Sequence, residues 1–180
     1  MEATHLSTLV EIAADLRRRA GQTEPAFSTQ QIVEACFPGT LVTGRALLKP
    51  EELVARGPDG YTIVYRRGLP VLEQRWLIAH AIGHVVFDGA RPRCRAGEAY
   101  DASERRCDAF ADELLAPLDE IEPYVGCATP VDEDGERREI YLDMVDLIAS
   151  HFAVPPAVID RRIRELRRPS SDLHNLQLPP

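Results

Sequence analysis

The sequence predicts an α+β fold that is mainly helical and contains a short sheet. Apolar residues recur at helical spacing in several segments, and a β-rich run, Tyr-Thr-Ile-Val-Tyr, follows a Pro-Asp-Gly turn. The length of 180 residues is most simply that of one domain with its own core. Hydrophobic residues make up 44% and charged residues 28%, which are ordinary values for a soluble globular protein.

Charge and the N-terminal segment restrict the expected location and partners. The chain carries 29 acidic and 21 basic side chains and has a net charge of -8. This acidic excess argues against a protein whose whole surface binds nucleic acid. Glu2 stands where a signal peptide would have a basic residue, and no long apolar region follows it. The longest apolar stretch, Trp76 to Phe87, is too short to cross a bilayer. We therefore expect a cytoplasmic protein that does not bind membranes.

Two helices are expected before the sheet. His5 to Arg19 carries apolar residues at helical spacing and three arginines at its C-terminal end, where they complement the helix dipole. Ser28 and Gln31 have the spacing of a capping box that would begin a short second helix. Pro38-Gly39 would end that helix.

The sheet and a buried helix come next. Leu41–Leu48 and Tyr61–Arg66 are predicted as strands, and Glu51–Arg56 between them as a helical turn. Pro70–Phe87 is predicted as a helix that is apolar on most of its sides. A helix of that kind is buried, so its two histidines should lie inside the packed body of the protein.

The C-terminal half is predicted to be helical, with loops between the helices. Helical spacing and proline or cap signals predict helices at Asp101–Leu115 (capped by Asp101 or Ser103), Pro117–Val125, Glu136–Phe152 and Ala157–Arg168, and loops at Asp88–Ala99 and Gly126–Gly135. The last two helices form a C-terminal pair. We expect residues 1–168 to be one domain and residues 169–180 to be a flexible tail.

The cysteines show no paired spacing. In a chain without an export signal we expect reduced thiols, which are most simply small buried apolar residues or surface thiols. A zinc site built from cysteines is an alternative that the spacing does not favour. The four residues are Cys36, Cys94, Cys107 and Cys127.

His80 and His84 are the central feature of the chain. They are four residues apart on the predicted buried helix, so their imidazoles share one face and can bind a single metal ion. The spacing is that of the metalloprotease pattern H-E-x-x-H, in which the glutamate is the general base for a metal-bound water. Here Ala81 occupies the position of that glutamate. Two histidines satisfied by ordinary backbone or carboxylate partners are the alternative to a metal site.

A third ligand is predicted on the following helix. Glu104 and Asp108 are also four residues apart and share a helix face. Either can complete the two-histidine, one-carboxylate set of an open zinc site, with the other orienting a histidine. The alternative for Glu104 is a capping role at the start of its helix. Such a site also accepts manganese, cobalt or iron, so zinc is one of several candidate metals.

Two motifs resemble the ImmA/IrrE family of metallopeptidases. Residues 74–84, Gln-Arg-Trp-Leu-Ile-Ala-His-Ala-Ile-Gly-His, are similar to the family pattern Q-R-F-x-x-A-H-E-x-G-H. Residues 104–117, Glu-Arg-Arg-Cys-Asp-Ala-Phe-Ala-Asp-Glu-Leu-Leu-Ala-Pro, are similar to E-x-x-A-N-x-F-A-A-x-L-L-M-P. The segment from Ile148 to Ile163 looks like the closing helical pair of the family. The resemblance covers Leu6 to Arg168, and the two central motifs are specific when they occur together.

The resemblance implies a small zincin-like domain with a short three-stranded sheet packed on the motif helix and a C-terminal two-helix element. It implies that His80, His84 and Glu104 bind the metal. Asp108 takes the place of a family asparagine and is expected beside the site. Many members cleave a helix-turn-helix repressor and so control prophage, mobile-element or stress-response genes. We expect a protein partner of the same kind here and no direct binding to nucleic acid.

Ala81 departs from the family pattern and predicts an inactive or nearly inactive peptidase. General acid–base assistance is typically worth about 10²–10⁴ in rate, so its loss should leave only slight turnover. Ala81 is either an introduced replacement of the family glutamate or a natural loss. The second case would make the chain a non-catalytic protein that acts as a metal-dependent sensor or binds a transcription regulator.

The remaining candidates have simpler explanations. Glu113 is a possible substitute base, but it is nine residues past Glu104 and on the opposite side of the helix, which favours a surface or packing role. His151 is near a helix end, where a cation complements the C-terminal dipole, and this favours a structural role over metal binding. His5 and His174 are expected to be exposed.

The last helix is basic, so DNA binding by a helix-turn-helix is an alternative function. No glycine turn joins the last two helices, and Pro155-Pro156 indicates a helix start instead. A solvated face, or one that docks the partner repressor, is therefore the preferred interpretation. Its basic residues are Arg161, Arg162, Arg164, Arg167 and Arg168.

Overall fold

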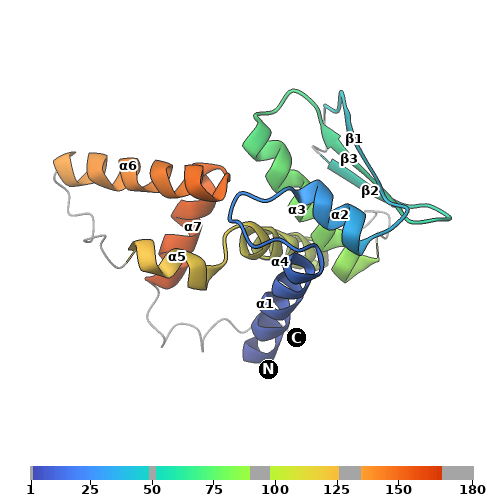
Figure 1. Cartoon of the computed structure of the whole chain (residues 1–180), viewed down its shortest axis with the longest axis horizontal. Coiled ribbons are helices and arrows are strands. Elements are labelled where there is room, and N and C mark those ends of the chain that lie inside the picture. Colours follow the sequence, from blue (N-terminus) through green and yellow to red (C-terminus); the bar gives the residue numbers. More distant parts are fainter. Residues whose placement is uncertain (1, 49–51, 90–97, 126–134, 168–180) are drawn as a thin grey trace.

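The α+β fold predicted from the sequence is the one observed. The computed structural model describes residues 2–48, 52–89, 98–125 and 135–167, which form seven helices and three strands. In chain order the elements are α1 (Glu2–Arg19), α2 (Thr29–Cys36), β1 (Leu41–Arg45), β2 (Glu52–Arg56), β3 (Tyr61–Arg66), α3 (Val71–Asp88), α4 (Glu98–Leu115), α5 (Leu118–Val125), α6 (Gly135–Phe152) and α7 (Pro156–Leu166). Figure 1 shows the sheet at one end of the molecule and α5, α6 and α7 at the other, with α3, α4 and α1 between them.

Several predicted boundaries need correction. The helix predicted from His5 begins at Glu2, and the strand predicted to reach Leu48 ends at Arg45. Ser28 is the N-cap residue of α2, but its side chain makes no cap hydrogen bond, so the predicted capping box with Gln31 is wrong. The predicted loop at 126–135 and tail at 169–180 lie outside the described residues, apart from position 135.

The helix that carries the second motif is also longer than predicted. It begins at Glu98 rather than near residue 101, so the two predicted caps, Asp101 and Ser103, lie inside it. Glutamate and alanine are good helix formers, and Glu98 and Ala99 extend the helix toward its N-terminus.

The sheet has the order β1-β3-β2, with β3 parallel to β1 and antiparallel to β2. The helical turn predicted for Glu51–Arg56 is wrong, because Glu52–Arg56 is strand β2. Glu, Leu, Ala and Arg favour helix in isolation, but each residue of β2 pairs with a residue of β3 across the turn at residues 57–60. Strand pairing therefore overrides the local helix preference.

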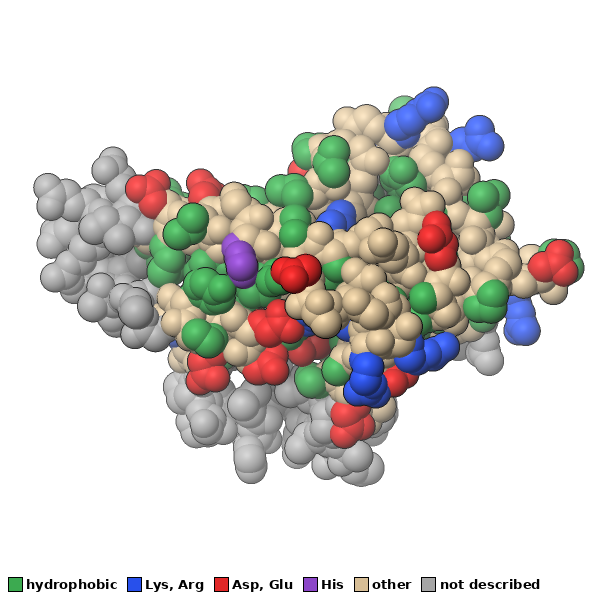
Figure 2. Space-filling view, in the orientation of Figure 1, with side chains coloured by type: hydrophobic (Ala, Val, Ile, Leu, Met, Phe, Trp, Pro, Cys, Tyr) green, Lys and Arg blue, Asp and Glu red, His purple; other side chains and the backbone are tan. Residues whose placement is uncertain are grey.

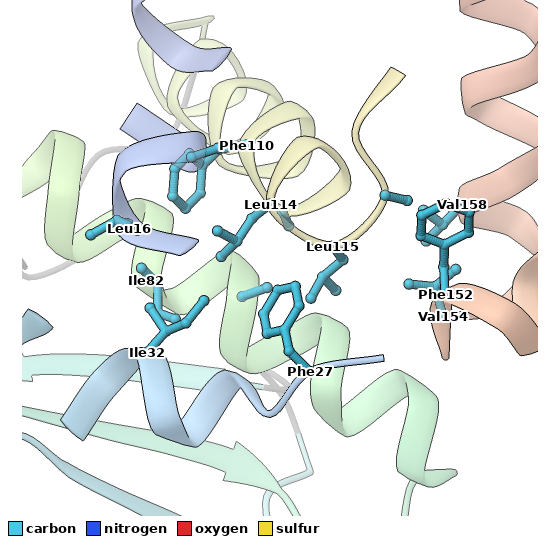
Figure 3. Close-up of a cluster of buried hydrophobic side chains, with 14 of the residues drawn as sticks. Leu16, Phe27, Ile32, Ile82, Phe110, Leu114, Leu115, Phe152, Val154 and Val158 are labelled. Carbon is cyan, nitrogen blue, oxygen red and sulfur yellow. The ribbon is translucent and has the colours of Figure 1, made fainter. Parts of the chain in front are cut away.

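Helix α3 is the central element of the fold. It contacts β2 and β3 on one side and α4 on another. The prediction that this helix is buried is confirmed, since Ala79, Ala81 and Ile82 have no exposed surface. Figure 3 shows side chains of α1, α2, α3 and α4 meeting in one apolar cluster, with Phe152, Val154 and Val158 extending it toward the C-terminal pair.

Arg75, near the start of α3, joins segments that are far apart in the sequence. Its guanidinium donates hydrogen bonds to the carbonyls of Pro25 and Phe27, before α2, and to those of Phe152 and Ala153, at the end of α6. Burial, helped by the charge of Arg17, lowers the pKa of Arg75 to about 10, so the group is still a cation at neutral pH. One side chain thus holds the N-terminal and C-terminal parts to the central helix.

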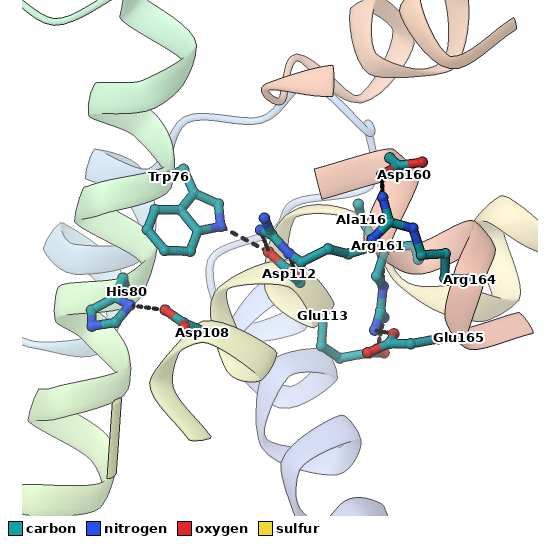
Figure 4. Close-up of polar contacts among 11 residues, drawn as sticks. Trp76, His80, Asp108, Asp112, Glu113, Ala116, Asp160, Arg161, Arg164 and Glu165 are labelled. Atoms are coloured by element: carbon teal, nitrogen blue, oxygen red, sulfur yellow. Dashed lines mark hydrogen bonds and ion pairs between the residues drawn. The ribbon is translucent and has the colours of Figure 1, made fainter. Parts of the chain in front are cut away.

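The basic face of α7 is turned partly inward. Arg162 is 3% exposed; it pairs with buried Glu113 of α4 and donates to the Ala116 carbonyl. Arg161 makes a bidentate ion pair with Asp112, the residue before Glu113 (Figure 4). The predicted solvated face is therefore wrong for Arg162, because its charge is needed by a buried carboxylate.

Charge on the visible surface is segregated. Figure 2 shows acidic and apolar side chains over the end of the molecule formed by α5, α6 and α7, and most Arg side chains of that face lie toward the other end. No single helix in the part of the chain that the structure describes is both long and apolar enough to cross a membrane.

The described cysteines are buried. Cys36 and Cys107 are free thiols with little or no exposed surface, as expected for small apolar residues. Cys94 and Cys127 lie outside the described residues.

We predict that Arg162→Ala lowers the free energy of unfolding by about 3–5 kcal/mol, because it leaves the buried Glu113 carboxylate without its counter-charge. The matched control is Arg164→Ala, whose side chain is exposed and pairs with Asp160, and it should cost less than about 1 kcal/mol. Urea unfolding followed by circular dichroism measures both. Equal losses in the two variants would show that the inward pair does not stabilise the fold.

Candidate metal centre

The two histidines of the first motif face one another inside the protein. His80 and His84, one turn apart on α3, are 5% and 4% exposed. Their Nε2 atoms are 3.0 Å apart. Their burial and common face agree with the sequence-based prediction.

A glycine lets the second motif helix approach them. A Cβ atom at Gly83 would lie 3.2 Å from Cα and from Cβ of Cys107 on α4, a separation tighter than ordinary side-chain contacts. Because this residue has no side chain, the backbones of α3 and α4 come close at this point. The approach places Glu104, Cys107 and Asp108 against the histidine pair.

Glu104 spans the two histidines. One of its carboxylate oxygens is 3.3 Å from Nε2 of His80, and the other is 3.4 Å from Nε2 of His84. Its position inside α4, six residues from the first residue of the helix, rules out the capping alternative. The structure therefore brings together the three residues expected to bind a metal.

The outer nitrogens of the imidazoles have partners of their own. His80 Nδ1 lies 2.9 Å from Asp108 Oδ1 (Figure 4), and His84 Nδ1 lies 3.5 Å from Cys107 Sγ. Burial by itself lowers the pKa of His80, but the hydrogen bond with Asp108 and the charges of the nearby carboxylates outweigh it and raise that pKa. Protons on both Nδ1 atoms would leave both Nε2 atoms as lone-pair acceptors.

Sequence reasoning missed Glu52, a second buried acid at the site. It is the first residue of β2, is 4% exposed, and points its Oε1 at the histidines. That oxygen is 3.6 Å from Nε2 of His80 and 3.8 Å from Nε2 of His84. The sequence predicts a helical turn for its segment, and an acid there has no spacing relation to either motif. A strand prediction for this segment was the signal needed to find it.

The donor atoms fit one divalent ion. Tetrahedral zinc with bonds of about 2.0–2.2 Å to nitrogen and oxygen needs ligand atoms about 3.3–3.5 Å apart. The measured separations between the two imidazole nitrogens and from these nitrogens to the Glu104 oxygens are 3.0, 3.3 and 3.4 Å. Two imidazole lone pairs and a carboxylate that converge in this way repel one another unless a cation lies between them.

Cys107 is a further possible ligand that sequence reasoning set aside. The potential ligand atoms of His80, His84 and Cys107 all lie within 4.8 Å of one another. The sulfur, however, faces Nδ1 of His84, whereas His80 and Glu104 face its Nε2. An ion on the Nε2 side meets more donors, so Cys107 is better placed to orient His84 than to bind the same ion.

The other candidates lie away from this centre. Glu113 is buried in its ion pair with Arg162, which agrees with the expected packing role. His151 is exposed in the last turn of α6 and is 3.0 Å from the Tyr124 hydroxyl. The side chain of His5 and the whole of His174 lie outside the described residues. Ala81 has no exposed surface and belongs to the apolar core.

Comparison with known proteins identifies one matching family. Residues 39–164 match the family model Peptidase_M78, described as the IrrE N-terminal-like domain. This range contains the sheet, both motif helices and most of the C-terminal pair. A search of curated proteins found no significant match.

We predict that Gly83→Ala lowers the free energy of unfolding by about 1–3 kcal/mol, because the added methyl group pushes α3 away from α4. Helix propensity alone predicts the opposite sign, since alanine in a helix is more favourable than glycine by about 1 kcal/mol. Thermal and urea unfolding give the sign directly. A more stable variant would show that the two helices can separate at no cost.

Proposed function

Because the chain belongs to the peptidase family of the IrrE N-terminal-like domain, we propose that it is a divalent-metal-binding protein that recognises a helix-turn-helix transcriptional repressor. In this proposal His80, His84 and Glu104 bind the ion, with zinc as the expected metal and manganese as an alternative. Asp108 orients His80 through Nδ1. Ala81 leaves the chain inactive or nearly inactive as a peptidase.

The observation that carries the metal proposal is the convergence of acceptor atoms. The Nε2 atoms of the two buried histidines lie 3.0 Å apart, and each lies within 3.4 Å of one oxygen of Glu104. The set of two histidines and one carboxylate is common in zinc hydrolases. A bound zinc ion supplies Lewis-acid activation of a water molecule or carbonyl group.

Ala81 decides how much hydrolysis the chain can perform. Its methyl group cannot accept a proton from water or deliver one to a leaving amine. The position is enclosed by the core, so no solvent molecule has direct access to that side chain. The scaffold would hold a substrate without the group that assists its cleavage.

A repressor is the partner that the family membership supports. The chain has a net charge of -8, and a DNA-binding protein usually presents a basic surface, so long-range attraction favours their encounter. Control of prophage, mobile-element or stress-response genes is the expected context. Three of the arginines considered for DNA contact, Arg161, Arg162 and Arg164, already form ion pairs with acidic residues of the chain.

A second candidate function is a natural pseudopeptidase that binds a transcription regulator in a metal-dependent way. The sequence supports this candidate, because Ala81 supplies no general base at the position where the family pattern has glutamate. The codon at position 81 of the source gene distinguishes the two origins, since a glutamate codon excludes the pseudopeptidase.

We predict that protein purified without chelator contains about one divalent ion per chain, and that His84→Ala loses it. A ligand set reduced to one histidine and one carboxylate should not retain zinc through gel filtration. The control is His151→Ala, which removes an exposed histidine outside the centre. Elemental analysis measures the metal content. Equal metal content in the parent and in His84→Ala would remove the metal proposal.

We predict that the zinc-loaded double variant Glu52→Ala, Ala81→Glu cleaves a repressor encoded beside the gene about 10²–10⁴ times faster than Glu52→Ala alone, because the general base is restored. Glu52→Ala is included in both chains because that carboxylate lies 3.6 Å from Nε2 of His80, close to the position that the reactive water needs. The rate should be compared between samples of equal metal content and equal thermal stability, since the new carboxylate enters a buried position. Gel analysis of the repressor over time measures cleavage. If the metal-loaded variant cleaves no candidate repressor, the peptidase scaffold is wrong as an account of function.

A further inference from the structure

We propose that Glu52 is a fourth metal ligand, which closes the centre and converts it from an open hydrolytic site into a saturated one. This inference rests on the proposed metal binding by His80, His84 and Glu104. It assigns to the sheet a role in the centre that neither motif contains.

The distances place Glu52 among the ligand atoms. Its Oε1 lies 3.6 and 3.8 Å from the Nε2 atoms of His80 and His84. Tetrahedral zinc requires ligand atoms to be about 3.3–3.5 Å apart, so the shifts needed are a few tenths of an ångström. The oxygen stands on the same side of the histidine pair, the Nε2 side, as the carboxylate of Glu104.

The same distances argue against Glu52 as a replacement for the missing base. In an open centre, water takes the fourth position, at the ligand spacing given above. A general base takes a proton from that water, so it lies at hydrogen-bond distance from the water oxygen, about 2.5–3.0 Å, and farther from the metal than the water is. The Glu52 oxygen lies 3.6 and 3.8 Å from the imidazole nitrogens, within a few tenths of an ångström of ligand spacing, and so is close to where the water itself would be.

Charge favours the same conclusion. Burying a carboxylate is expensive unless a positive charge compensates it, and the Glu52 side chain is 5% exposed. Two neutral imidazoles and two carboxylates carry a total charge of -2, which a divalent cation neutralises. Structural zinc sites use all four positions for protein ligands, whereas catalytic sites keep one for water. A saturated centre agrees with the loss of the general base at Ala81.

The fold holds Glu52 in place. It begins β2 and pairs with Tyr65 of β3, and both strands contact α3. The four ligands would thus come from three elements, the strand β2 and the helices α3 and α4. A bound ion would join the sheet to both motif helices, so metal binding should stabilise this half of the protein against unfolding.

The test compares zinc affinity in the full-length chain and two variants, measured by competition with a coloured chelator. Glu52→Gln keeps the size of the side chain and removes its charge, and Glu73→Gln makes the same change at an exposed acid in the first turn of α3. We expect Glu52→Gln to weaken zinc binding by about 100-fold or more, since loss of an outer partner alone costs about 10–100-fold. Glu73→Gln should match the parent within about threefold.

A second measurement can overturn the proposal with the parent chain alone. Cobalt bound in place of zinc has a visible spectrum that changes when an added anion binds to it. Azide should leave the spectrum of the cobalt-loaded parent unchanged, because no position is open, and should change that of Glu52→Ala. An azide response in the parent overturns the proposal, whether or not the variants fold.

The outcomes separate this inference from the function on which it rests. If the parent and Glu73→Gln bind no zinc, both are wrong. If they bind zinc, His84→Ala abolishes binding and Glu52→Gln retains the parent affinity, only the fourth ligand is wrong. Cleavage of a repressor by the zinc-loaded parent that is lost in Glu52→Gln at unchanged affinity would make Glu52 a base, and would also overturn the proposal.

Discussion

The contact between α3 and α4 at Gly83 is the constraint on which the centre depends. Each helix carries ligand candidates on one face, but neither helix alone brings a histidine to a carboxylate. An ideal Cβ at this glycine would lie 3.2 Å from the Cys107 backbone, so a larger residue requires neighbouring atoms to shift by a few tenths of an ångström. Ile82, Phe110 and both histidines are buried in this region, and polar interactions are stronger in such surroundings than in water.

In the proposed account, the chain departs from an active metallopeptidase at two places that act on the same step. Ala81 removes the group that handles the proton, and Glu52 approaches the position where the reactive water would stand. Either change alone would weaken hydrolysis. Together they fit the proposal of a protein that keeps its metal for structure or sensing, because a saturated ion would hold three elements together without reacting.

Sequence reasoning was most successful where a local pattern decides the structure. The 3.6-residue spacing predicted α3 to within one residue at each end, and both motifs occupy the helices predicted for them. The pairing of β2 depends instead on β3, so a segment with good helix formers was assigned to the wrong class. Glu52 was missed for the same reason, since its approach to the histidines is a property of strand register and not of spacing along the chain. The sequence predicts Cys107 as a small buried apolar residue or a surface thiol; the first is true of its exposure but does not include its contact with His84.

The two consecutive ion pairs between α4 and α7 have a consequence for how this family can diverge. Asp112 and Glu113 are buried acids whose partners, Arg161 and Arg162, lie almost fifty positions later in the chain. A change at Asp112-Glu113 leaves the arginines of α7 without their counter-charges, and a change at Arg161-Arg162 does the same to the acids of α4. Relatives should therefore replace both pairs of residues together or keep both. Asp112 also accepts a hydrogen bond from Trp76, one turn before His80. A hybrid protein with α7 from a relative that lacks the two arginines would lose its ion pairs with α4. It would also lose support for Trp76, which lies beside the metal centre.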